Sequence, residues 1–329
     1  MSACGPFELP DPSRAIWAQR QKLSDNLDRI KEADEILKEV MGGPKDFPRQ
    51  QWTQFVSLIL EFQPDLIIEL GRGWGNSTCA FSLAAEWLQD VNCKILSLCL
   101  SDAWQTKTYP RLLESFSRHD IFRRVEAMIA DIRTFDFTKH LAGRRRVFVF
   151  WDVHGWDVAE AILTNLLSRL KDVAHLVVIH DMADASHMAP DCLVGDEAAW
   201  LALGSAMPKF RFGSMCSQYE EGILLEDFAT RNQINLRSAE SSYFVNLTPA
   251  QVQILTSLFG PTYFSQYGFW YFFSAYRPQA QLQFRVSRLL DGLEAADTGA
   301  SQPEPVSSKS GPKTLRARLR AFVKPMERR

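Results

Sequence analysis

Between about residues 47 and 235 the chain alternates short apolar runs with longer segments of helical periodicity. This alternation constrains the fold strongly, because apolar runs separated by helices are typical of parallel strands that are covered on both faces. The strand-like runs lie at 65–70, 94–100, 125–131, 146–152 and 175–181, and helical segments at 48–62, 76–88, 108–117 and 157–170 separate them. Crossovers between parallel strands are right-handed. The sequence therefore predicts a doubly wound α/β fold.

Two shorter strand candidates follow a helical segment near 194–204. They lie at 210–216 and 222–228 and are separated by only five residues. Such close spacing is typical of a hairpin, which would place one antiparallel strand at the edge of the sheet.

The segments before and after this region differ from it in character. Residues 13–41 carry apolar residues at three-to-four spacing and predict one helix, which either packs on the α/β domain, joins copies in a homo-oligomer or caps a ligand. Thr248 and Pro249 form a helix-start signature. The densely aromatic stretch 263–276 either packs in the core or forms the wall of an apolar substrate pocket.

The last stretch is rich in Ser, Pro and Gly and then in Arg and Lys, which predicts a disordered basic tail that is solvated or touches an anionic surface. The expected division of the chain is therefore an N-terminal helical segment, an α/β domain, a helical and aromatic subdomain and a basic tail, at 1–46, 47–235, 236–293 and 294–329.

Charge and composition exclude several classes of protein. Among 329 residues, 37 Lys and Arg stand against 39 Asp and Glu, so the net charge of −2 disfavours a nucleic-acid binder, which needs a basic excess. No apolar run approaches the roughly 18 residues of a membrane span, and the N-terminus lacks the pattern of a secretory signal. The six cysteines are scattered without a C-x-x-C pair, which favours reduced thiols and a cytoplasmic location.

The most specific motif is a glycine-rich turn directly after the first apolar run. Glu69 is followed by Gly71, Gly73 and Gly75, and a helical segment begins at Asn76. Glycines let the backbone turn tightly and let a ligand approach it, and the helix N-terminus offers free N–H groups. Asn76 stands where a dinucleotide-binding G-x-G-x-x-G motif requires glycine. The acid suits an amine-bearing ligand, while a purely structural turn is the alternative.

This E-x-G-x-G-x-G turn resembles motif I of class I S-adenosylmethionine-dependent methyltransferases, and the resemblance extends over about 47–230 as an order of strands and helices. It implies a Rossmann-like, seven-stranded, mostly parallel sheet with the order 3-2-1-4-5-7-6, strand 7 being antiparallel. It also implies that Gly71, Gly73 and Gly75 lie along the cofactor and that Glu69 supports the amino end of its methionine part.

The same resemblance implies two further contacts with the cofactor. An acid near the end of the second strand commonly holds the ribose hydroxyls, and Ser101 and Asp102 are the candidates here. Asp131, which follows the third strand, matches the acid that commonly lies near the adenine amino group. A simple turn residue is the alternative for Asp131.

Acids and histidines follow the fourth and fifth strand-like runs. Asp152 and His154 come after one, and His180 and Asp181 come at the end of the next. Carboxyl ends of neighbouring parallel strands meet at one edge of the sheet, so these side chains can converge. An imidazole titrates near neutral pH, which makes His154 the first candidate for a general base, with Asp152 and Asp181 beside it.

This pair of segments resembles the branch of methyltransferases that acts on sugars and macrolides, including cephalosporin-hydroxylase-like proteins. In its metal-dependent members the corresponding acids bind a divalent cation that holds substrate hydroxyls. The resemblance implies a Mg²⁺ or Mn²⁺ site at Asp152, His180 and Asp181. A catalytic cluster without metal, and capping of the strand ends, are the alternatives.

The sequence as a whole favours an S-adenosylmethionine-dependent O-methyltransferase with a small molecule or glycan as methyl acceptor. A cephalosporin-hydroxylase-like protein or a non-catalytic cofactor-binding protein of the same fold is the alternative. A nicotinamide-dependent dehydrogenase is disfavoured by Asn76.

Overall fold

The fold is described from a computed structural model of the chain. The structure describes residues 8–42, 47–88, 92–180, 210–212, 215–217, 221–239, 246–266, 268, 270–278 and 281–284. The chain divides into two units, 1–286 and 287–329, and every described residue lies in the first. The basic tail expected at 294–329 therefore lies outside the described residues.

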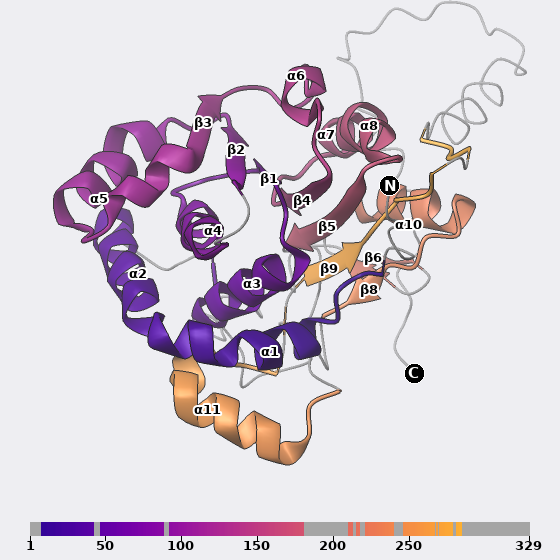
Figure 1. The fold of residues 1–329 in the computed structure, drawn as a ribbon. Helices are drawn as coiled ribbons and strands as arrows, with labels where there is room; N and C mark the ends of the chain where they lie inside the picture. Colours follow the sequence, from indigo (N-terminus) through magenta and orange to yellow (C-terminus); the bar gives the residue numbers. More distant parts are fainter. Residues whose placement is uncertain are drawn as a thin grey trace, which may run out of the picture. The chain divides into compact units, whose positions relative to one another are not determined.

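One mixed sheet forms the centre of the fold, in the order β3-β2-β1-β4-β5-β9-β8 (Figure 1). The strands are β1 (Leu66–Leu70), β2 (Lys94–Cys99), β3 (Val125–Ile129), β4 (Arg146–Trp151), β5 (Ala174–His180), β8 (Arg237–Ser238) and β9 (Trp270–Phe273). The first five run parallel to one another, and β9 pairs antiparallel with β5. The predicted α/β class with a mostly parallel central sheet is confirmed.

Helices cover both faces of this sheet. They are α1 (Pro12–Asp25), α2 (Leu27–Met41), α3 (Arg49–Phe62), α4 (Asn76–Trp87), η1 (Trp104–Thr108), α5 (Tyr109–Ser115), η2 (His119–Arg124), α6 (Thr138–Leu141), α7 (Trp156–Ala161), η3 (Ile162–Leu167), α8 (Ser168–Leu170), α10 (Glu221–Arg231) and α11 (Pro249–Tyr263). None of the described helices combines the length and the apolar character that crossing a lipid bilayer requires.

Alternation along each strand divides the core into two layers. Ile67 packs in the layer that contains α1–α4 and α11, whereas its neighbours Leu66 and Ile68 pack in the layer that contains α7, η3 and α10. Successive side chains of a strand point to opposite faces of the sheet, so a continuous apolar run supplies both layers. Figure 1 shows α1, α3 and α4 on one side of the sheet and α7 and α8 on the other.

The predicted closing hairpin is wrong. The first candidate contains β6 (Phe210–Phe212), which pairs with β7 (Met215–Ser217) in a separate two-stranded sheet, and the second falls in the helix α10. Leu224, Leu225 and Phe228 are buried at spacings of one and four, which is a helical pattern. A short apolar run does not by itself separate a strand from a helix, so the close spacing was misleading.

The antiparallel strand comes instead from the aromatic stretch 263–276. All four residues of β9 are buried, with Trp270 in one core layer and Tyr271 and Phe273 in the other. Trp270 also donates a hydrogen bond from Nε1 to Oε1 of Gln54 in α3, at 3.2 Å. Of the two interpretations of this stretch, core packing rather than a pocket wall is the one that the burial of β9 supports.

The segment 13–41 forms two helices rather than one. The break lies at Asn26, whose side-chain amide donates to the carbonyl of Lys22 and whose backbone φ and ψ are −119° and 10°. Asn competes for backbone hydrogen bonds in this way and therefore favours helix ends.

A buried carboxylate connects the second of these helices, α2, to α11 and α3. Asp34 Oδ2 accepts a hydrogen bond from the Tyr263 hydroxyl at 3.0 Å and lies 2.8 Å from Nε of Arg49.

Trp270→Ala tests whether β9 is an integral part of the core. The substitution removes a fully buried indole and leaves Gln54 without this hydrogen-bond donor, so we expect the free energy of unfolding to fall by about 3–5 kcal/mol. Urea denaturation measures the change. Ile254→Ala in α11 is the control, because Ile254 is 45% exposed and its loss should cost about 0.5 kcal/mol or less. Equal effects of the two substitutions would contradict a buried β9.

Candidate active site at the carboxyl edge of the sheet

The glycine-rich turn connects β1 to the N-terminus of α4. Gly71, Gly73 and Gly75 have φ values of 95°, 51° and 96°, a region that side chains other than glycine rarely adopt. A Cβ on Gly71 would lie 2.0 Å from the carbonyl oxygen of Asp152, and one on Gly75 would lie 2.2 Å from the ring of Trp104. The two outer glycines therefore serve close packing against β4 and η1.

Behind the turn, the carboxylate of Glu69 is completely buried and fully engaged. It accepts hydrogen bonds from the hydroxyls of Ser77 at 2.5 Å, Thr78 at 2.7 Å, and Ser97. These donors belong to the first turn of α4 and to β2, so one side chain joins three elements. Burial raises the pKa of the Glu69 carboxyl, and the three hydroxyl donors and the charge of Arg72 oppose that rise.

Arg72, inside the turn, is also buried. Its Nη1 donates to the carbonyl oxygen of Ser97 at 2.8 Å and to the Ser97 hydroxyl at 3.0 Å, and its Nη2 donates to the carbonyl of Met128 at 3.4 Å. Its Nε is buried without a hydrogen-bond partner among the described residues. Burial lowers the pKa of the Arg72 guanidinium, and the Glu69 carboxylate opposes that change. Arg72 thus links the carboxyl ends of β2 and β3 to the turn.

A cleft of about 300 Å³ opens at this edge of the sheet. Its lining comes from the turn, from α4, from the carboxyl ends of β2 and β4 and from Phe47, and consists of Phe47, Gly71, Arg72, Gly73, Asn76, Ser77, Cys99, Asp152, Val153 and His154. Four residues that the sequence singled out are therefore brought together here, namely Gly71, Gly73, Asp152 and His154.

Asp152 is held in place by a buried histidine from the next strand. Oδ1 of Asp152 lies 3.0 Å from Nδ1 of His180, and Nε2 of the same ring lies 2.8 Å from Oε1 of Gln51 in α3. The ring is surrounded by aromatic side chains, with centroids 5.6 Å from those of Phe47 and Phe150. Both ring nitrogens therefore face oxygen atoms, the Asp152 carboxylate on one side and the Gln51 amide on the other.

The other predicted cofactor residues lie outside the lining of this cleft. Asp131 forms a two-pronged ion pair with Arg133, with distances of 2.7 and 3.0 Å, and these hydrogen bonds lower the pKa of its carboxyl. The Ser101 hydroxyl accepts from the backbone N–H of Ala103, and Asp102 is exposed beside it. Glu69, Gly75 and His180 stand behind the lining as described above, while Asp181 lies outside the described residues.

Among the described residues, no group of three or more His, Cys, Asp and Glu side chains is arranged to hold a metal ion. Asp152 and His180 do meet, but they bond to each other, and the second nitrogen of His180 bonds to Gln51. A metal would need one of these nitrogen lone pairs, so the arrangement does not fit a metal ligand at His180.

Sequence reasoning missed the inner parts of this site. Gln51 belongs to a helix expected only to cover the sheet, and its contact with His180 spans 129 positions in the sequence. Arg72 carried one signal that could have been used, because a basic residue between two turn glycines needs acceptors nearby. Ser77 and Thr78 carried another, since two hydroxyls in the first turn of a helix are ready donors for a neighbouring acid.

Comparisons with known proteins give structural likenesses only. No family model and no curated protein matches the chain. SAH-bound methyltransferase PaMTH1 of Podospora anserina is similar at 16% identity, over 72% of this chain and 93% of that one, with a TM-score of 0.38. Cofactor-bound Rv0187 from MTB is similar at 14% identity, over 70% and 90%, with a TM-score of 0.39.

A third similar structure is that of cmcI with SAH, at 16% identity and a TM-score of 0.30. The match covers 42% of this chain and spans 62% of the length of that one. Because these likenesses are weak, the function proposed below rests on the residues of the cleft.

Glu69→Gln tests the buried carboxyl through the pH dependence of stability. The folded state raises the pKa of Glu69 above its usual value of 4.5, so it keeps the proton to a higher pH than the unfolded state does. Above about pH 4.5 the free energy of unfolding of the natural protein should therefore fall with rising pH relative to the variant, by at most about 1.4 kcal/mol per pH unit.

Urea denaturation at several values between pH 4.5 and 7 measures this difference. Glu114→Gln is the control, because the Glu114 side chain is 71% exposed and the same substitution there should leave the pH dependence unchanged. A difference between the Glu69 variant and the natural protein that does not vary with pH would contradict a raised pKa.

Proposed function

We propose that this protein is an S-adenosylmethionine-dependent O-methyltransferase of a small molecule or glycan. The observation that carries the proposal is the cleft at the carboxyl edge of the sheet, where the glycine turn and the N-terminus of α4 face Asp152 and His154 at the end of β4. Ligands of open α/β sheets bind beyond the carboxyl ends of the strands, at the point where the strand order reverses, which here lies between β1 and β4.

The donors around the cleft fit the charges of this cofactor. Asn76 and Ser77 stand at the N-terminus of the 12-residue helix α4, whose partial positive charge suits the cofactor's carboxylate. The Asp152 carboxylate suits its ammonium and sulfonium charges. Gly73 contributes backbone without a side chain to the lining of the cleft. Nε of Arg72, which is buried and has no hydrogen-bond partner in the described part of the chain, offers one further donor.

In this proposal Glu69 acts from behind the turn. Its three hydroxyl partners fix the first turn of α4 and the end of β2, so that the backbone N–H groups keep their direction. The contacts of Ser101, Asp102 and Asp131 with the cofactor remain predictions, and so does that of Gly75.

Bound cofactor supplies an electrophilic methyl group, and the chain must place an acceptor oxygen in line with it and remove that oxygen's proton. Alignment of this kind contributes about 7–11 kcal/mol to methyl transfer. His154 is exposed at the cleft and takes the proton in our proposal. Asp152 orients the groups in the cleft, and His180 holds it through the 3.0 Å contact.

No step is assigned to a metal, because His180 is engaged on both nitrogens. A Mg²⁺ or Mn²⁺ site that includes Asp181 stays a prediction. The second candidate function is a non-catalytic or hydroxylase-like cofactor-binding protein. It is favoured by Cys99, which ends β2 at the cleft where methyltransferases commonly place an acid.

Titration of the protein with S-adenosylmethionine by calorimetry tests cofactor binding, and Gly73→Val tests the place of binding. Valine adds a branched side chain to the lining, so we expect at least tenfold weaker binding, or about 1.4 kcal/mol. Gly143→Val is the matched control, because Gly143 also has a positive φ of 73° and faces open space. No binding by the natural protein, or equal loss in both variants, would contradict the proposal.

His154→Gln tests the transfer step. We expect about 10²–10⁴-fold slower formation of S-adenosylhomocysteine over a panel of hydroxylated acceptors, with cofactor affinity unchanged. Binding of the cofactor without transfer to any acceptor, in the natural protein too, would favour the non-catalytic alternative.

A further inference from the structure

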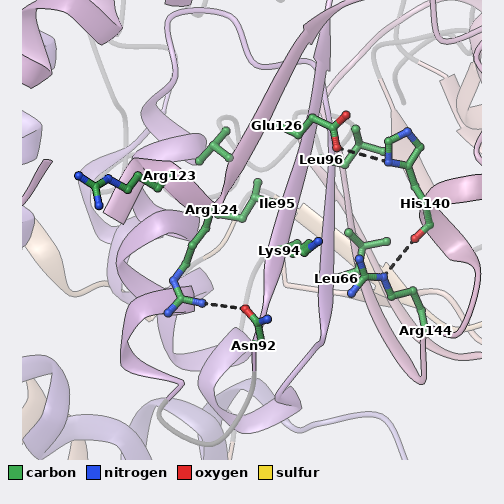
Figure 2. A pocket seen from close by; sticks show the side chains of 11 residues that line it. Leu66, Asn92, Lys94, Ile95, Leu96, Arg123, Arg124, Glu126, His140 and Arg144 are labelled. Atoms are coloured by element: carbon green, nitrogen blue, oxygen red, sulfur yellow. Dashed lines mark hydrogen bonds and ion pairs between the residues drawn. The ribbon is translucent and has the colours of Figure 1, made fainter. Parts of the chain in front are cut away.

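A second cleft, of about 400 Å³, lies at the opposite end of the sheet, where β1, β2 and β3 begin (Figure 2). Its volume falls within the range of about 300–1,000 Å³ that is usual for small-molecule sites. It shares no lining residue with the first cleft, and the length of the parallel strands separates the two. Its occupant is therefore a different molecule from the proposed cofactor.

Basic side chains from neighbouring strands meet in this cleft. The pairing of Ile95 with Val125 places Lys94 beside Arg124 in the same register, and neighbouring strands are about 4.8 Å apart. Figure 2 shows Lys94 between Arg124 on one side and Arg144 on the other. Like charges on adjacent strands repel each other, so this arrangement costs stability in the empty protein.

Within the described ranges, no carboxylate forms an ion pair with Lys94, Arg124 or Arg144. Arg124 donates from Nη1 to the side-chain oxygen of Asn92 at 3.5 Å and to the carbonyl of Cys93 at 3.4 Å, which are neutral acceptors. Arg144 likewise donates to the carbonyls of His140 and Asp65, each at 3.1 Å.

Lys94 is exposed, and its ammonium group forms no hydrogen bond or ion pair within the described part of the chain. A chain with a net charge of −2 thus concentrates positive charge at one concave place.

Glu126 is the one carboxylate among the described residues that line this cleft. It lies at the far end from Arg124 and approaches Nδ1 of His140 at 3.6 Å (Figure 2). Burial lowers the pKa of His140, which favours the neutral form of its ring. A ligand must therefore bring negative charge to the lysine end and a hydrogen-bond donor, such as a hydroxyl group, to the glutamate end.

We propose that this cleft binds a phosphorylated, hydroxyl-bearing small molecule such as a sugar phosphate, with the phosphate at Lys94, Arg124 and Arg144 and a hydroxyl at Glu126. A phosphate dianion offers several acceptor oxygens to the forked guanidinium groups and to the ammonium group. It also removes the repulsion between Lys94 and Arg124. The proposal is independent of methyl transfer at the other edge.

Calorimetric titration with ribose 5-phosphate at low salt tests this site, with ribose and inorganic phosphate as the two partial probes. We expect the natural protein to bind ribose 5-phosphate more tightly than phosphate, and ribose not at all. Lys94→Gln should weaken binding of ribose 5-phosphate about tenfold or more, since it removes a charge-assisted hydrogen bond. Thermal unfolding checks that the variant is folded.

Arg145→Gln is the matched control. Arg145 directly precedes β4 at the same end of the sheet, its side chain is 87% exposed, and it is not part of the lining. Its substitution therefore changes the net charge as Lys94→Gln does, but removes no contact with the ligand. Equal weakening by both substitutions would show a diffuse charge effect and overturn the site. The site would also be overturned if millimolar ribose 5-phosphate showed no detectable binding, or if Lys94→Gln left its binding unchanged. Vesicles that contain phosphatidic acid probe the other source of a phosphate group, and binding to these vesicles alone would overturn the site as well.

Discussion

The buried carboxylate of Glu69 is the interaction on which the carboxyl edge of the sheet depends. A carboxylate without solvent is costly unless hydrogen bonds satisfy it, and here three hydroxyls and the nearby charge of Arg72 do so. Its partners lie on β2 and on the first turn of α4. Satisfying one side chain therefore fixes the end of one strand and the start of one helix, and the glycine turn between them has little remaining freedom.

The two ends of the sheet carry different chemistry because its central strands are parallel. At the carboxyl ends, the turn and the residues after β4 present backbone N–H groups, a carboxylate and an imidazole. At the amino ends, the residues just before or at the starts of the strands include Lys94, Arg124 and Arg144. An overall charge near zero hides this separation, which appears only once the strands are aligned.

The sequence was most informative where local pattern and burial agree. All five parallel strands form at the predicted runs. A strand that is buried on both faces is a continuous apolar run, so the sequence alone reveals it. It failed where the pattern was ambiguous: Leu224, Leu225 and Phe228 fit a short strand or a helix equally well by composition. It also failed at Asn26, a residue type that favours helix ends, where the helix is interrupted although the apolar spacing continues.

For the candidate site, the sequence identified residues that end strands but not those that reach them from elsewhere. Asp152 and His154 follow a strong strand, so the sheet alone predicts their edge. Gln51 and Arg72 acquire their roles through contacts with residues distant in sequence. The role expected for Glu69 illustrates the same limit, because an acid at a strand end can face either a ligand or the hydroxyls of the next helix.

Helix α3 connects the aromatic strand to the carboxylate of the cleft. Gln51 and Gln54 are three positions apart, so they share one face of the helix, and both are buried. Gln51 contacts His180, which holds Asp152, while Gln54 accepts the hydrogen bond of Trp270 in β9. A shift of α3 along its axis would disturb both contacts together. The packing of a strand far along the chain thus helps to set the direction of the carboxylate at the end of β4.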